Sequence, residues 1–164
     1  MKHPRLWSVF GAFCLIAAAA SLAMIHAQQD DAQRFSSGRF LTTITDSEGS
    51  FASRSVITLN ADGTLSAIDS NEGSSTGPFG AQAGAWKWDG GGRIVGRVID
   101  FRYPPVSTSA SIARSDYALT LAPDGRSLTG TITVYFYPLE GSNPLQGLGT
   151  LFGTFNVVGE PIAP

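Results

Sequence analysis

Apolar residues recur at every second position over most of the chain after Gly38, and β-branched and aromatic side chains fill most of these positions. A repeat of two is typical of strands that bury one face, whereas helices repeat about every 3.6 residues. The pattern predicts eight strands and no helix in this part of the chain, and hence an all-β fold. The expected strands are Arg39–Thr45, Phe51–Asn60, Thr64–Asp69, Ala85–Asp89, Arg93–Tyr103, Ser111–Leu121, Leu128–Tyr137 and Thr150–Val158.

Three of the expected connections carry residues that favour tight turns. They are 60–64 (Asn-Ala-Asp-Gly-Thr), 89–92 (Asp-Gly-Gly-Gly) and 123–125 (Pro-Asp-Gly). Glycine and aspartate tolerate the positive φ angles that tight hairpins require. Strands adjacent in the sequence should therefore pair antiparallel, which favours an eight-stranded up-and-down barrel, with a β-sandwich as the alternative. Eight strands enclose enough space for side chains or one small ligand.

Turn positions also predict which residues share a face, because the turn sets the register of a hairpin. A turn centred near Ser107 sets Arg97 opposite Tyr117, and the glycine-rich turn sets Arg97 opposite Gly84. The next turn sets Tyr117 opposite Ile132. These registers predict one apolar inner face made of Trp86, Trp88, Val95, Ile99, Phe101, Leu119, Leu121, Leu128, Ile132, Val134 and Phe136.

Arg97 is the strongest candidate for a ligand-binding residue, because a guanidinium that points into a barrel needs a partner. With Tyr117 it is expected to bind a carboxylate or another anionic head group at the bottom of an apolar pocket. The alternative is a structural arginine that stacks on Trp86 and closes the barrel floor. Trp86 and Trp88 are expected either to stack on a ligand or to pack in the core.

Small polar side chains on the predicted inner face indicate space inside the barrel. Ser55 and Ser115 point inward in this register, as does Ser53. Such groups either bind water or leave a cavity, and a cavity is what a ligand needs. Ser55 and Ser115 therefore join Arg97 and Tyr117 as candidate ligand-binding residues.

The carboxylates are the remaining candidates for acid–base chemistry. Asp69 is the one acid that the pattern places on the inner face, at the end of its strand. Asp100 is expected opposite Arg114 on the outer face, as an exposed ion pair worth a few tenths of a kcal/mol. No catalytic residue is therefore assigned.

The first 27 residues have the layout of a secretory signal peptide. Lys2 and Arg5 precede an apolar run from Leu6 to Ile25, which ends at the polar Gln28. Such a run is short for a membrane span. We expect cleavage after Ala27, a flexible lead-in over 28–36, a single barrel domain over 37–164, and a secreted or periplasmic protein without a stable membrane span.

Removal of the signal peptide would leave the chain without several residue types that are common in catalytic and metal sites. Both histidines, the one cysteine and both methionines lie within residues 1–27, and Lys87 is the one lysine that remains. Serine or cysteine catalysis with histidine, His/Cys metal sites and disulfides are excluded, and no metal or cofactor is expected. Nine of the 11 basic residues remain against 13 acidic ones, without a basic cluster, which argues against nucleic acid as a partner.

The order of several motifs resembles the bacterial secreted lipocalin-like, calycin-type small β-barrel proteins. These motifs are Gly38-Arg39-Phe40-Leu41-Thr42, Ile57-Thr58-Leu59-Asn60-Ala61-Asp62-Gly63-Thr64, Gly84-Ala85-Trp86-Lys87-Trp88, Leu119-Thr120-Leu121-Ala122-Pro123-Asp124-Gly125 and Leu128-Thr129-Gly130-Thr131. The resemblance implies a barrel and permits a ligand in its interior. It implies no catalytic residue.

Three functional hypotheses follow. The first is a secreted, non-catalytic module that holds one small apolar or amphipathic molecule in the barrel. The second is a small-barrel cyclase or isomerase that acts on a hydrophobic substrate through Arg97, Tyr117 and Asp69. The third is a structural or surface-interaction domain with a filled interior. The volume of any cavity separates the third hypothesis from the others, and the oligomeric state is left open.

Overall fold

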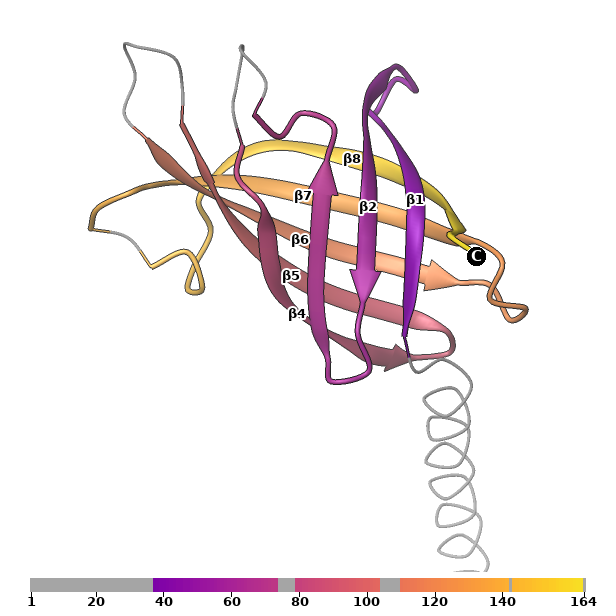
Figure 1. Ribbon diagram of the computed structural model, residues 1–164. Coiled ribbons are helices and arrows are strands. Elements are labelled where there is room, and N and C mark those ends of the chain that lie inside the picture. Colours follow the sequence, from indigo (N-terminus) through magenta and orange to yellow (C-terminus); the bar gives the residue numbers. More distant parts are fainter. Residues whose placement is uncertain (1–36, 74–78, 104–109, 142, 164) are drawn as a thin grey trace, which may run out of the picture.

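The computed structural model describes residues 37–73, 79–103, 110–141 and 143–163, and its strands close into a single antiparallel barrel (Figure 1). The expected signal peptide and lead-in lie outside these residues. The strands are β1 Gly38–Thr45, β2 Phe51–Leu59, β3 Thr64–Asp69, β4 Gln82–Gly90, β5 Arg93–Arg102, β6 Ser111–Leu121, β7 Leu128–Pro138 and β8 Thr150–Pro161. The described ranges contain no helix, and so none that could cross a membrane.

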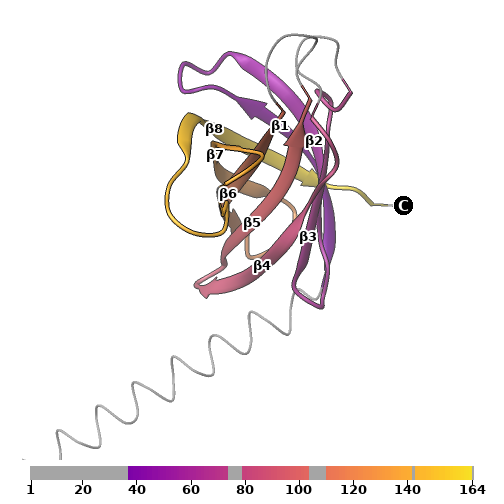
Figure 2. The ribbon, with the colours of Figure 1, turned by 90° about the vertical axis from the view of Figure 1, so that its left-hand side faces the viewer.

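Each strand pairs with its neighbours in the sequence, and β1 pairs with β8 to close the barrel. This is the predicted up-and-down order, and it excludes the β-sandwich. Figure 2 shows the strands wrapped around a common interior, with β7 and β8 across from β3 and β4. Alternate residues of each strand face that interior, which is why the repeat of two in the sequence located the strands.

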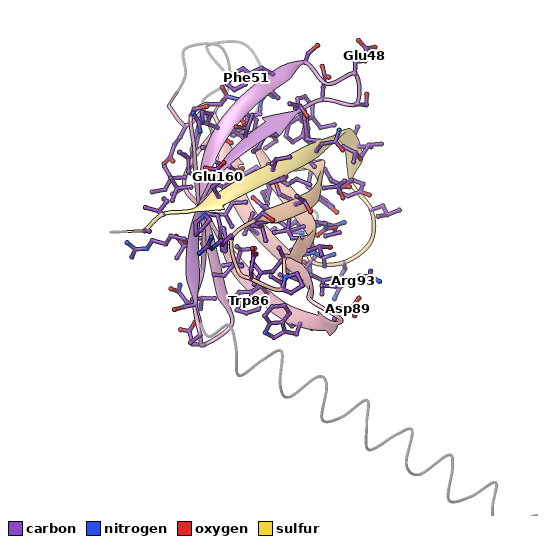
Figure 3. The ribbon with its side chains drawn as sticks, turned by 90° about the vertical axis from the view of Figure 1, so that its right-hand side faces the viewer. Glu48, Phe51, Trp86, Asp89, Arg93 and Glu160 are labelled. Carbon is purple, nitrogen blue, oxygen red and sulfur yellow. The ribbon has the colours of Figure 1, made fainter. Side chains whose placement is uncertain are left out.

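One end of the barrel is filled by large apolar side chains. Phe40, Leu59, Leu65, Ile94, Leu119 and Leu128 are almost fully buried there. Trp86 packs against this cluster, and its Nε1 donates a hydrogen bond to the carbonyl oxygen of Asn60 at 3.0 Å. We call this the closed end. Figure 3 shows Trp86, Asp89 and Arg93 toward it and Glu48 and Phe51 at the opposite, open end.

The register of β6 with β7 is the predicted one, with Tyr117 opposite Ile132. The registers on both sides of β5 differ from the prediction by one residue. Arg97 pairs with Asp116 instead of Tyr117, and Trp86 pairs with Gly96. A shift of one residue turns every side chain of a strand to the other face.

The shift has a local cause at the β4–β5 turn. The pairing is irregular between Trp88 and Gly90, which leaves Asp89 as an extra residue, and Gly90, Gly91 and Gly92 all have positive φ angles. A bulge of this kind moves the register of the next strand. The predicted inward orientation of Val95, Arg97, Ile99 and Phe101 is therefore wrong, and Ile94, Val98 and Asp100 are the residues of β5 that are buried in the interior.

Neighbouring strands approach so closely at two glycines that no side chain fits. A Cβ on Gly84 would lie 1.9 Å from the carbonyl oxygen of Arg97 and 2.7 Å from the Cα of Val98. A Cβ on Gly130 would lie 2.1 Å from the carbonyl oxygen of Ala118. These contacts involve backbone atoms, so the strands themselves would have to move.

We expect Gly84→Ala to lower the free energy of unfolding by about 2–4 kcal/mol, because the new methyl group would push β4 away from β5. Urea denaturation followed by circular dichroism measures the change. Gly80→Ala is the matched control, since its Cβ would meet nothing closer than 3.5 Å. Equal stabilities of the two variants would contradict the close packing of β4 on β5.

Candidate functional site

A cavity of about 270 Å³ occupies the open end of the barrel. It lies between the last residues of β1, β3, β5 and β7 and the first residues of β2, β4, β6 and β8, opposite the filled closed end. Most of its wall is apolar, and the polar groups converge from several strands. The apolar lining residues are Ile44, Ala52, Phe79, Ala113, Ile132, Val134, Phe152 and Phe155; the polar ones are Ser53, Asp69, Asn71, Gln82, Asp100, Ser115 and Tyr117.

Aromatic rings form a continuous row beside the cavity. Phe79 stacks on Phe136 with ring centroids 6.3 Å apart, and Phe136 lies 4.7 Å from Phe152. Phe152 in turn lies 6.1 Å from Phe155. Three of these four residues line the cavity, so a bound molecule meets aromatic surface on this side.

Asp100 is the most unusual residue of the cavity wall. It is 3 % exposed, and its Oδ1 atom has no hydrogen-bond partner among the described residues. Burial, and after it the charges of Asp69 and Glu72, raises the pKa of the Asp100 carboxyl from 3.8 to about 7. The prediction that Asp100 forms an exposed ion pair with Arg114 is wrong, because the register of β5 turns Asp100 inward.

Asp69, at the end of β3, lines the same cavity, as predicted. Its Oδ2 accepts a hydrogen bond from the Ser53 hydroxyl at 2.9 Å, and its Oδ1 accepts one from the backbone amide of Asn71 at 2.9 Å. Both oxygens thus have a partner. Asp69 is not the single inward acid that the sequence pattern indicated, since Asp100 lies in the same wall.

Tyr117 faces the cavity from β6, as predicted, and its hydroxyl donates a hydrogen bond to Oε1 of Gln82 at 2.9 Å. Burial, and after it the charges of Asp69 and Asp100, raises the pKa of this phenol well above its ordinary value. Tyr117 is therefore a neutral hydrogen-bonding group at any ordinary pH. Since its proton is donated to Gln82, the phenol oxygen offers its lone pairs to other groups.

The remaining candidate residues divide between the cavity and the packed interior. Ser115 lines the cavity. Ser55 is buried and donates to the carbonyl oxygen of Ile68 at 3.0 Å, but it is not part of the cavity wall. Trp86 and Trp88 contact each other edge to face, 5.6 Å apart, at the closed end. Their positions agree with the second of the two predicted roles, packing in the core, and not with stacking on a ligand in the cavity.

Arg97 lies outside the barrel. Its Nε and Nη2 atoms donate to the two carboxylate oxygens of Asp116, and its side chain is 44 % exposed. The predicted inward partnership of Arg97 with Tyr117 is therefore wrong, for the register reason given above. The cavity lacks the guanidinium on which the expectation of an anionic head group rested.

Arg114 is a structural residue that the sequence pattern placed on the outer face only as an exposed partner of Asp100. It lies on the outer face of β6 but is only 2 % exposed, because the β7–β8 connection covers it. Its Nη1 donates to the carbonyl oxygens of Pro144 and Gly147 at 2.8 and 2.9 Å, and its Nη2 lies 3.1 Å from Oδ2 of Asp116. The guanidinium also lies over two tyrosine rings, those of residues 135 and 137.

Comparisons with protein-family models, with curated proteins and with solved structures give no match.

We expect Arg114→Met to lower the free energy of unfolding by about 2–4 kcal/mol, because it removes a buried guanidinium that holds the β7–β8 connection and pairs with Asp116. Arg97→Met is the control, since it removes an exposed arginine from the same Asp116 and should cost less than about 1 kcal/mol. Denaturant titration of both variants measures the difference. A larger loss in Arg97→Met would contradict the outward position of Arg97.

The raised pKa of Asp100 predicts a pH dependence of stability. Between pH 4 and 7 the native state keeps a proton on Asp100 that the unfolded chain releases. The contribution of Asp100 to stability is thus fully present below about pH 4 and is lost as the pH rises through about 7.

Asp100→Asn should remove this contribution. The free energy of unfolding of the variant minus that of wild type should therefore rise by on the order of 2 kcal/mol or more between pH 4 and pH 8. Thermal unfolding at a series of pH values measures it. Asp89→Asn, at the closed end, makes the same change of charge and should show no such shift. A flat difference for Asp100→Asn would contradict its burial in the native protein.

Proposed function

We propose that the barrel is a non-catalytic binding module that holds one small, mostly apolar molecule in its open end. The cavity of about 270 Å³ carries this proposal. It is slightly smaller than the sites of about 300–1,000 Å³ that hold drug-sized ligands, so the ligand is a small molecule. The filled closed end supports the proposal too, because it gives the cavity a rigid floor.

The wall chemistry agrees with this class of ligand. Apolar and aromatic side chains dominate, and a few polar groups lie among them, as in sites that bury a ligand body and orient it by one end. A structural domain with a filled interior would not leave such a space. The eight-stranded closed barrel is compatible with the lipocalin-like resemblance, in which the ligand occupies the barrel interior.

A second candidate function is acid–base catalysis on a hydrophobic substrate, such as an isomerisation or cyclisation. The observation that favours it is the pair of carboxyl groups, Asp69 and Asp100, in one cavity, with the pKa of Asp100 raised to about 7. A general base or acid works best with a pKa near the working pH. Chromatography of the molecule before and after incubation with the protein separates the two functions, because a binding module returns it unchanged.

The layout of residues 1–27 supports export as the route by which the module reaches its ligand. We propose cleavage after Ala27. Amino-terminal sequencing of the exported protein should then begin at Gln28, and retention of Met1 on that form would contradict the proposal.

Filling the cavity should abolish binding. Ala113 lies in the cavity wall and is 2 % exposed, so Ala113→Phe places a ring in the space a ligand needs. Ala118→Phe is the matched control, since residue 118 is exposed on the outer face of the same strand. Ligand-observed NMR with 2-phenylethanol, a small neutral molecule with one ring, measures binding to each protein.

Wild type and Ala118→Phe should bind 2-phenylethanol, and Ala113→Phe should bind it at least tenfold more weakly. Circular dichroism checks that each variant is folded, and Ala52→Leu, which fills the cavity from β2, is the second variant if Ala113→Phe does not fold. Unchanged binding after the cavity is filled would overturn the proposal. The proposal would also be overturned if wild type does not bind 2-phenylethanol and native mass spectrometry shows no retained molecule.

A further inference from the structure

The described charged groups of the cavity wall are acidic. Asp69 and Asp100 line the cavity, and Glu72 lies near enough to raise the pKa of Asp100. Asp69 is satisfied by Ser53 and the amide of Asn71, whereas Oδ1 of Asp100 has no partner among the described residues. A buried carboxyl group without a full set of donors is unfavourable, so a ligand that donates a hydrogen bond to it is stabilised there.

We propose that the cavity recognises a small primary amine, whose ammonium group is held by Asp100 beside Asp69 while its apolar body lies against the aromatic row. This inference rests on the proposed binding function and specifies the class of its ligand. An ammonium group has three N–H donors and a positive charge, so it can donate to the Asp100 carboxyl group and also neutralises the buried carboxylate. A neutral hydroxyl provides the donor but not the charge.

The aromatic row favours the same ligand. Phenylalanine rings pack well against an apolar ligand body, and Phe79, Phe152 and Phe155 line the cavity that holds the two carboxyl groups. The phenol oxygen of Tyr117 adds a further acceptor, because its proton is donated to Gln82. Aromatic surface, carboxyl groups and a free phenol lone pair together form a site for a cationic head on an apolar body.

Other ligand classes fit less well. Among the described residues no three His, Cys, Asp or Glu side chains lie together as a metal site requires. An anionic head group would be repelled by the acids of residues 69, 72 and 100. Arg102, at the end of β5, is not part of the cavity wall, and its guanidinium lies over the Phe136 ring at 5.4 Å. The charges that act on the pKa of Asp100 are Asp69 and Glu72, and both are acids.

The raised pKa of Asp100 also predicts how the affinity for the amine depends on pH. In the protein without amine the Asp100 carboxyl has a pKa of about 7, whereas an ammonium beside it favours the ionised form. Binding below pH 7 must therefore release a proton from Asp100. The affinity for the amine should fall about tenfold for each unit that the pH drops below about 7, and should level off above it.

The experiment compares three compounds that share a phenyl body: 2-phenylethylamine, 2-phenylethanol and phenylacetate. Isothermal titration calorimetry at pH 8 with the exported protein should give an affinity for the amine at least tenfold above that for the alcohol. Phenylacetate should bind more weakly than both. Asp100→Asn should remove the preference for the amine, whereas Asp89→Asn, the same change at the closed end, should leave it intact.

Circular dichroism checks the fold of Asp100→Asn, and Asp69→Asn is the second variant, expected to weaken amine binding several-fold. Equal affinities for amine and alcohol would overturn the amine inference and leave the binding function standing. Strongest binding of phenylacetate, lost in Arg102→Met, would overturn it in favour of an anion site at the rim. Binding of none of the three compounds would count against both the inference and the proposed function.

Discussion

The register of β5 is the constraint on which the chemistry of this barrel depends. The extra residue at Asp89 and the three glycines after it set that register at the β4–β5 turn. One residue of difference decides whether Arg97 or Asp100 lies in the interior, and so whether the cavity is basic or acidic. The ion pair of Arg97 with Asp116 on the outer face and the buried Asp100 inside are two results of the same turn.

The two ends of the barrel divide stability and recognition between them. At the closed end, residues such as Phe40, Leu59 and Leu128 bury almost all of their apolar surface, which stabilises the fold. At the open end, the interior holds small and polar side chains, and Asp100 is kept there at a cost in stability. A buried carboxyl without a full set of partners is tolerated because the other end supplies the stability.

The sequence predicted the fold closely because the alternation of apolar residues and the turn residues pointed to the same strands. It predicted the faces of β6 and β7 correctly, since β6 has a clear alternation from Tyr117 to Leu121. It failed for β5, where Ile94, Val95, Val98 and Ile99 are apolar on both faces, so that periodicity does not choose between registers. The β5–β6 connection, residues 103–110, contains no Gly, Asn or Asp of the kind that fixes a tight hairpin, so the turn centred near Ser107 did not determine the register.

The sequence predicted only part of the candidate site, because the register of some strands was correct and that of β5 was not. Tyr117, Ser115 and Asp69 lie on strands whose register was correct or whose face was clear, and all three line the cavity. Asp100 was missed because it lies on β5. The burial of Arg114 was missed because a strand pattern treats the outer face as exposed to solvent, whereas here a connection covers it.

The pairing of β1 with β8 has a consequence for the order in which the molecule is assembled. Phe40 pairs with Pro161, and the amide of Ile162 donates to the carbonyl oxygen of Arg39, so the first and last strands complete each other's hydrogen bonds. Contacts between such distant parts of a chain form slowly, because a long loop must close first. Until β8 is available, β1 and β7 remain open edges, and the barrel is a curved sheet rather than a container. The interior, with its acidic cavity, thus exists only once the last strand has joined the first.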